Sequence, residues 1–91
     1  MKKDVIINRL IKKTDIAAES MLSKPLVELC GENRVYIENH WGICRYGTER
    51  IIIRVRYGSV CVSGTGLRLC KMTDDHLVIT GKIHSIELLR G

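Results

Sequence analysis

Between Val35 and Leu88 the chain consists of short segments in which β-branched residues occupy every second position, with glycines between the segments. The clearest example is the run from Arg50 to Tyr57. Because successive side chains of a strand point to opposite faces, this alternation predicts an antiparallel sheet with one buried face. In this run the predicted inner face has Ile51, Ile53 and Val55, and the outer face has Ile52, Arg54 and Arg56.

Glycines and polar turn residues divide the chain after residue 25 into about eight short strands. A flat sheet would leave one apolar face in water. We therefore expect a mainly β fold, either a small antiparallel β-sandwich or an open barrel-like meander. The predicted strands are 26–30, 34–38, 43–46, 50–57, 59–63, 67–72, 76–80 and 82–89. Four glycines are predicted to shape turns, and the last of them a bend or bulge: Gly42, Gly58, Gly64 and Gly81.

Residues 1–23 have a different pattern, in which apolar residues recur at roughly helical spacing and lysines or arginines fill the polar side. Thr14 and Asp15 form a suitable N-cap, and Pro25 disfavours a helix at the residue before it. We therefore expect one or two short amphipathic helices, or a tail, before an all-β domain at residues 24–91. The basic side of this segment leaves three contacts open: an anionic membrane, a partner protein or the sheet itself.

The net charge of +5 has two interpretations. A basic domain is attracted to polyanions, and a charge of this size also keeps a small domain soluble. No apolar run approaches the roughly 20 residues of a membrane-spanning helix. The cysteines lack the close spacing of a zinc ribbon and no secretory signal accompanies them. We therefore expect reduced thiols in a cytoplasmic protein at Cys30, Cys44, Cys61 and Cys70.

The sequence contains no motif of a common catalytic site. A nucleophile elbow, a phosphate-binding glycine loop and a helical zinc motif are all absent. The histidines show no metal-ligand spacing, and the candidate acidic residues lie on separate segments: Glu28, Glu38, Glu49 and Glu87. We therefore predict that the protein is not an enzyme and expect no catalytic residue, no cofactor and no metal.

Two features are candidates for binding. Trp41, in the string Glu38-Asn39-His40-Trp41-Gly42, is either an exposed anchor for a partner or a cover for the end of an aromatic-poor core. The arginines at positions 45, 50, 54 and 56 form either a solvated outer face or a surface for single-stranded nucleic acid. No RNA-binding aromatic motif accompanies them, so nucleic acid is the alternative and not the expected partner. The candidate partner contacts are Trp41, Ile52, Arg54 and Arg56.

Four strings recur in the order of a known family. They are I-E-N-H-x-G-I at residues 37–43, an alternating strand at 51–55, a G-x-V-x-V-x-G-x-x-L-x-L unit at 58–69, and I-x-G-x-I-x-S-I at 79–86. The last is the most specific, with Gly81, Ile83, Ser85 and Ile86 in place. Over about residues 15–89 the chain thereby resembles the YabP/YqfC family of sporulation proteins, its YqfC-like branch in particular.

The resemblance implies a small β-rich protein of the mother cell, needed for spore development. It implies a structural or assembly factor of the spore envelope that acts through protein–protein contacts, with no enzymatic activity. The expected partners are other sporulation proteins, including a membrane-associated one, and the chain could also form a homo-oligomer. A basic nucleic-acid-binding module and a membrane-surface adaptor are the alternatives. The expected location is the mother-cell cytoplasm, at the periphery of the developing spore.

Overall fold

The computed structural model describes residues 24–91, which form one antiparallel sheet. The strands follow the order β1-β2-β6-β5-β4-β3 across the sheet. The prediction of a mainly β, antiparallel fold is therefore confirmed. The predicted N-terminal helices lie outside the described residues. The strands are β1 (Leu26–Cys30), β2 (Arg34–Glu38), β3 (Ile43–Arg45), β4 (Arg50–Val55), β5 (Gly58–Met72) and β6 (His76–Arg90).

The predicted number of strands is wrong, because the last four predicted strands are two long ones. β5 and β6 have 15 residues each. β5 continues through Gly64, where a turn was predicted, and β6 continues through Gly81, where a bend or bulge was predicted between two strands. β4 is shorter than predicted. It ends at Val55, and the turn that follows consists of Arg56 and Tyr57. Gly58, predicted as the turn residue, is the first residue of β5.

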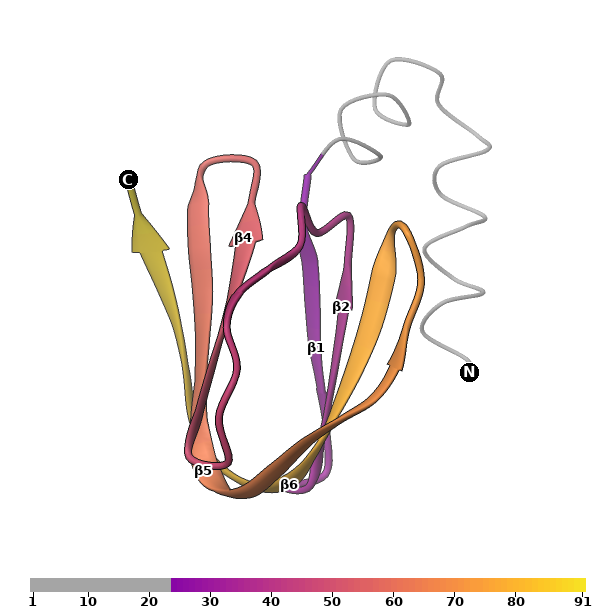
Figure 1. Ribbon diagram of the computed structural model, residues 1–91, viewed down its shortest axis with the longest axis vertical. Coiled ribbons are helices and arrows are strands. Elements are labelled where there is room, and N and C mark those ends of the chain that lie inside the picture. The colour runs from indigo at the N-terminus through magenta and orange to yellow at the C-terminus, as the bar shows by residue number, and fades with distance from the viewer. Residues whose placement is uncertain (1–23) are drawn as a thin grey trace.

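The two long strands bend together near their middles, and this bend folds the sheet over on itself (Figure 1). At the bend their pairing shifts register around Gly64 and between Thr65 and Arg68. A Cβ atom on Gly64 would overlap the carbonyl oxygen of Lys82. Gly81 has a φ of +137°, and a Cβ there would lie 2.7 Å from the carbonyl oxygen of Gly66. The bend therefore requires glycine where the two backbones come closest.

The bend creates two half-sheets that share one core. The first half-sheet contains β1, β2 and the segments 76–80 of β6 and 68–72 of β5. The second contains β3, β4 and the segments 58–63 of β5 and 85–90 of β6. Alternate residues of both half-sheets meet inside: Val35, Ile37, Leu77 and Ile79 from the first, Ile51, Ile53, Val55, Val60 and Val62 from the second, and Leu67 from the bend.

Two loops complete the hydrogen bonding of the bend. Where β5 leaves β4, the N–H groups of Gly64 and Leu67 donate to the carbonyls of Glu49 and Thr48. Where β6 leaves β2, the N–H of Gly81 donates to the carbonyl of Asn33. This bend end thus satisfies backbone groups that would otherwise be unpaired. The opposite, loop end of the molecule consists of residues 24–25, 39–42, 56–57 and 73–75 (Figure 1).

Candidate functional site

The loop that contains Trp41 connects the two half-sheets at the loop end. Asn39 has a φ of +64°, and its side-chain amide donates a 2.7 Å hydrogen bond to the carbonyl of Lys24. Its backbone N–H donates to the carbonyl of Asp75. Asparagine tolerates this left-handed conformation better than most residues, which explains how the chain can reverse here. The loop is therefore attached to both the start of β1 and the β5–β6 turn.

His40 fixes the same loop from inside and is 6% exposed. Its Nε2 donates a 3.0 Å hydrogen bond to the carbonyl of Thr73, and its Nδ1 accepts one of 3.0 Å from the N–H of Gly42. Because a carbonyl can only accept and an amide can only donate, both bonds form with the neutral Nε2–H tautomer. His40 is therefore a structural tie between this loop and the β5–β6 turn.

Trp41 itself points away from the core, and 62% of its surface is exposed. Its backbone is nevertheless held in place. The N–H of Trp41 donates a 2.7 Å bond to the carbonyl of Arg54, and the N–H of Arg54 donates a 2.8 Å bond to the carbonyl of Gly42. The interpretation of Trp41 as a cover for the core end therefore does not fit this exposure. The structure combines an exposed indole with a fixed backbone.

Of the other candidate contacts, Arg54 lies next to Trp41, to which its backbone is hydrogen-bonded, and Ile52 and Arg56 precede and follow it along the chain. Ile52 and Arg54 are on the outer face of β4, with Ile52 half-buried between Arg45 and Cys61 of the neighbouring strands. Arg56 is not on this strand as predicted but in the turn, where its guanidinium lies 5.2 Å from the ring centroid of Tyr57. We call Trp41, Ile52, Arg54 and Arg56 the contact face.

The β5–β6 turn at the loop end has its own polar cluster. Thr73 donates a 3.1 Å hydrogen bond to the Asp75 carboxylate, and Nδ1 of His76 lies 2.9 Å from the same oxygen. The hydrogen bond from His76, followed by that from Thr73, holds the pKa of Asp75 below its ordinary value. This cluster stabilises the turn to which His40 and Asn39 are attached.

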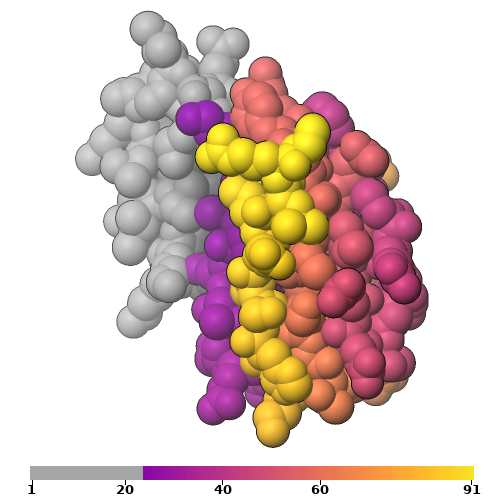
Figure 2. All heavy atoms as spheres, turned by 90° about the vertical axis from the view of Figure 1, so that its left-hand side faces the viewer, coloured from indigo at the N-terminus to yellow at the C-terminus, as the bar shows by residue number. Residues whose placement is uncertain are grey.

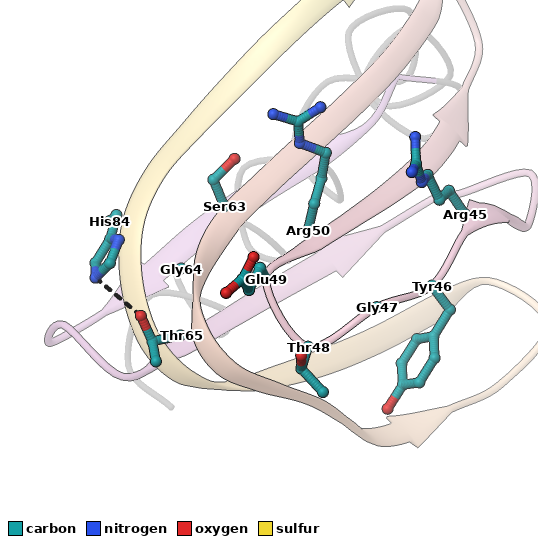
Figure 3. Close-up of a pocket in the computed structure, with 10 residues that line it drawn as sticks. All are labelled: Arg45, Tyr46, Gly47, Thr48, Glu49, Arg50, Ser63, Gly64, Thr65 and His84. Atoms are coloured by element: carbon teal, nitrogen blue, oxygen red, sulfur yellow. Dashed lines mark hydrogen bonds between the residues drawn. The ribbon is translucent and has the colours of Figure 1, made fainter.

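A polar hollow of about 670 Å³ lies at the bend end, on the outer side of the second half-sheet (Figure 3). Arg45 and Arg50 extend into it from the two ends of the β3–β4 loop, and Glu49 lies between them and the bend of β5. On the far side the hydroxyl of Thr65 is 3.4 Å from Nε2 of His84. We call the space between these side chains and Ser63 the hollow.

The arginines of the hollow are unpartnered within the described residues. Neither the Arg45 nor the Arg50 side chain forms a hydrogen bond or an ion pair there. Both belong to the basic group noted in the sequence, but Ser63, Thr65 and His84 were not predicted as site residues. They reach the hollow because the β3–β4 loop crosses to the bend of β5, a long-range contact with no local signal.

Metal and membrane features are absent from the part of the chain that the structure describes. No three His, Cys, Asp or Glu residues are grouped there in a way that could hold a metal ion. Residues 24–91 also contain no helix of the length and hydrophobicity needed to cross a membrane. The four cysteines are not paired with one another: Cys61 is buried, whereas Cys30, Cys44 and Cys70 are exposed.

Together these features define a small basic antiparallel β domain whose sheet is folded over by the bend in its two long strands, β5 and β6. Comparison with known proteins places it further: the YabP family model matches residues 22–91, and the chain belongs to this family. It is also similar to the uncharacterized protein YqfC of Bacillus subtilis (strain 168). The two are 22% identical over 82 residues, which cover 90% of this chain and 88% of that protein. No solved structure matches the chain significantly.

Proposed function

We propose that the protein is a non-catalytic sporulation protein, a structural or assembly factor that acts through protein–protein contacts as the spore envelope develops. In this proposal it works in the mother-cell cytoplasm, at the periphery of the developing spore. Its partners are other sporulation proteins, one of them membrane-associated. Membership in the YabP family supports the biological setting. The contact face supports the mode of action.

The proposal rests on one observation: the side chain of Trp41 is exposed, whereas the backbone of its loop is held in place by hydrogen bonds. The indole of Trp41 is 62% exposed, so it makes few contacts within its own domain. When a partner covers it, its apolar surface is removed from water, and this burial favours binding. Backbone bonds to Arg54 on one side and the buried His40 on the other hold the loop before any partner arrives. Such preorganisation reduces the entropy lost on binding. Arg54 and Arg56 add charge that favours an acidic partner surface.

Unpaired strand edges supply a second way to join neighbours. Of β6, only residues 76–80 pair with β2, and the N–H of Ile83 donates to the carbonyl of Glu32 in the β1–β2 turn. Residues 84–90 of β6 therefore have only β5 beside them among the described strands. Figure 2 shows this end of β6, in yellow, running along the surface turned to the viewer. Its free backbone groups could accept a strand from a partner or from a second copy. We therefore include self-association in the proposal, to be measured by light scattering.

The proposal is tested by cross-linking and pull-down from sporulating cells with wild type, Trp41→Ala and Arg54→Glu. Loss of a buried tryptophan anchor typically costs about 2 kcal/mol or more of binding free energy. We therefore expect recovery of the specific partner to fall sharply in both variants. Arg68→Glu is the matched control, because Arg68 is an exposed arginine on the first half-sheet, away from the contact face. Unchanged recovery in both contact-face variants would refute the proposed surface.

The two alternatives give different signatures. Binding of single-stranded nucleic acid weakens steeply as salt increases, because counterions are released from each neutralised phosphate. Membrane adsorption makes the full chain float with anionic vesicles and not with neutral ones. A protein–protein contact centred on Trp41 depends much less on salt, since burial of the indole supplies most of its free energy.

A further inference from the structure

The hollow shares no residue with the contact face, and its chemistry is different. Its lining is polar, and two guanidinium groups enter it from adjacent strands without a partner among residues 24–91. Guanidinium groups bind carboxylate and phosphate oxygens through paired N–H donors. The hydroxyl groups of Ser63 and Thr65 and the ring of His84 line the opposite side and offer further hydrogen bonds.

Three hydrogen bonds fix the frame of the hollow, two between backbone groups and one to a side-chain hydroxyl. The carbonyls of Thr48 and Glu49 accept hydrogen bonds of 2.8 Å and 3.0 Å from the N–H groups of Leu67 and Gly64. The hydroxyl of Tyr46 accepts a third, of 3.2 Å, from the N–H of Leu69. These three hydrogen bonds hold the β3–β4 loop against residues 64–69 of β5. Arg45 and Arg50 thus start from backbone positions that a ligand need not order.

The charge and size of the hollow define the class of ligand. A volume of about 670 Å³ is in the range of small-molecule sites and much larger than a lone phosphate or sulfate requires. Arg45 and Arg50 provide two positive charges, and Glu49 places one negative charge between them and the bend. A carboxylate repels a simple anion but accepts a hydrogen bond from a hydroxyl or amino group. The lining therefore fits a ligand with both kinds of group.

We propose that the hollow binds a small organic anion that also has hydroxyl or amino groups, of the size of a sugar phosphate or an acidic sugar. Arg45 and Arg50 hold the anionic group, and Glu49 accepts a hydrogen bond from a hydroxyl or amino group of the same ligand. Ser63, Thr65 and His84 complete the polar wall. This activity is separate from the partner contacts proposed above and does not depend on them.

The test is a titration of the full-length ¹⁵N-labelled protein, followed by NMR, with four probes. Glucose 6-phosphate and glucuronate are the two acidic sugars. Inorganic phosphate is an anion without a sugar ring, and glucose is a sugar without a charge. We expect at least one acidic sugar to shift the amides of residues 45–50, 63–65 and 84, to bind more tightly than phosphate, and to leave Trp41 unaffected. Binding of only one acidic sugar identifies which anionic group the site accepts. Glucose is expected to cause no shifts.

Three variants identify the groups responsible. Arg50→Gln removes one charged donor and is expected to weaken binding of the acidic sugar by about tenfold. Arg34→Gln makes the same change in an exposed arginine of the first half-sheet and is expected to leave the affinity unchanged. Glu49→Gln keeps a hydrogen-bond acceptor but removes the charge that repels phosphate, so it should reduce the preference for the acidic sugar over phosphate. The inference is overturned if neither acidic sugar shifts these amides, if phosphate binds as well as they do, or if Arg34→Gln weakens binding as much as Arg50→Gln does.

Discussion

At the scale of single residues, Gly64 and Gly66 occupy the same bend but need glycine for different reasons. Gly64 is buried, and any Cβ there would overlap the backbone of Lys82 in the paired strand. Gly66 has a φ of +62°, and a Cβ there would meet nothing within 4 Å. The first glycine permits close approach of two strands, whereas the second only adopts a left-handed conformation that is costly for other residues.

This difference predicts unequal effects of two matched substitutions. Gly66→Ala should lower the free energy of unfolding by about 1 kcal/mol, the ordinary cost of a left-handed alanine. Gly64→Ala forces the β5 and β6 backbones apart and should cost about 3 kcal/mol, as overpacking of a tight site does. Urea unfolding followed by circular dichroism measures both values. Equal losses in the two variants would mean that the bend adjusts freely at Gly64.

At the scale of elements, period-two alternation predicted where strands lie but not where they end. The segments around Val35, Ile53 and Val60 were predicted as strands and are strands, because alternation reflects the burial of one face. A glycine within a strand pattern indicates an unusual backbone conformation at that position. It does not indicate whether the strand ends there or continues. Gly64 was therefore interpreted as a turn, and Gly81 as a bend or bulge between two strands, although β5 and β6 each continue past these positions and pair with each other on both sides of them.

The candidate sites, too, could be predicted from the sequence only in part. The exposed arginines of β4 follow from alternation, so Arg50 and Arg54 were placed on the outer face from sequence. The hollow depends on the β3–β4 loop reaching Gly64 and Leu67, which are about 15 to 20 residues further along the chain. Contacts over that separation leave no periodic pattern. His40 lies between two predicted strands, 34–38 and 43–46, but its hydrogen bond to Thr73 is likewise a product of the tertiary fold.

The loop at residues 39–42 provides a test of how His40 holds Trp41. His40→Ala removes two hydrogen bonds from a buried site and should cost about 2–3 kcal/mol of stability. It should also release the loop, and because the chain has a single tryptophan, fluorescence anisotropy reports on Trp41 alone. We expect the local motion of the indole to increase under conditions where the variant is still folded.

His84→Ala is the control for this substitution. His84 is exposed, and its only side-chain hydrogen bond among the described residues is the one of 3.4 Å with Thr65. Its removal should change the free energy of unfolding by less than about 0.5 kcal/mol and leave the anisotropy of Trp41 unaltered. If His40→Ala behaved in the same way as His84→Ala, the bonds of His40 would not be what fixes the loop.

At the scale of the whole molecule, the two half-sheets depend on each other. Each has one apolar face, and each covers the face of the other, so neither would be stable alone in water. β5 and β6 also run through both half-sheets without interruption. A fold of this kind should therefore unfold as one unit and not as two.

Ile79 allows a direct test of this cooperativity, because it is fully buried in the first half-sheet and belongs to the same core as Ile51 and Ile53 of the second. Ile79→Ala should lower the free energy of unfolding by about 2–5 kcal/mol through lost burial and the cavity that remains. Hydrogen exchange should show protection falling by the same free energy in β2 and in β4, since the amides of both exchange through global unfolding. Val78→Ala, at the outward-facing neighbour, should cost clearly less. Loss of protection confined to β1, β2 and residues 76–80 would instead show that the bend separates two independent folding units.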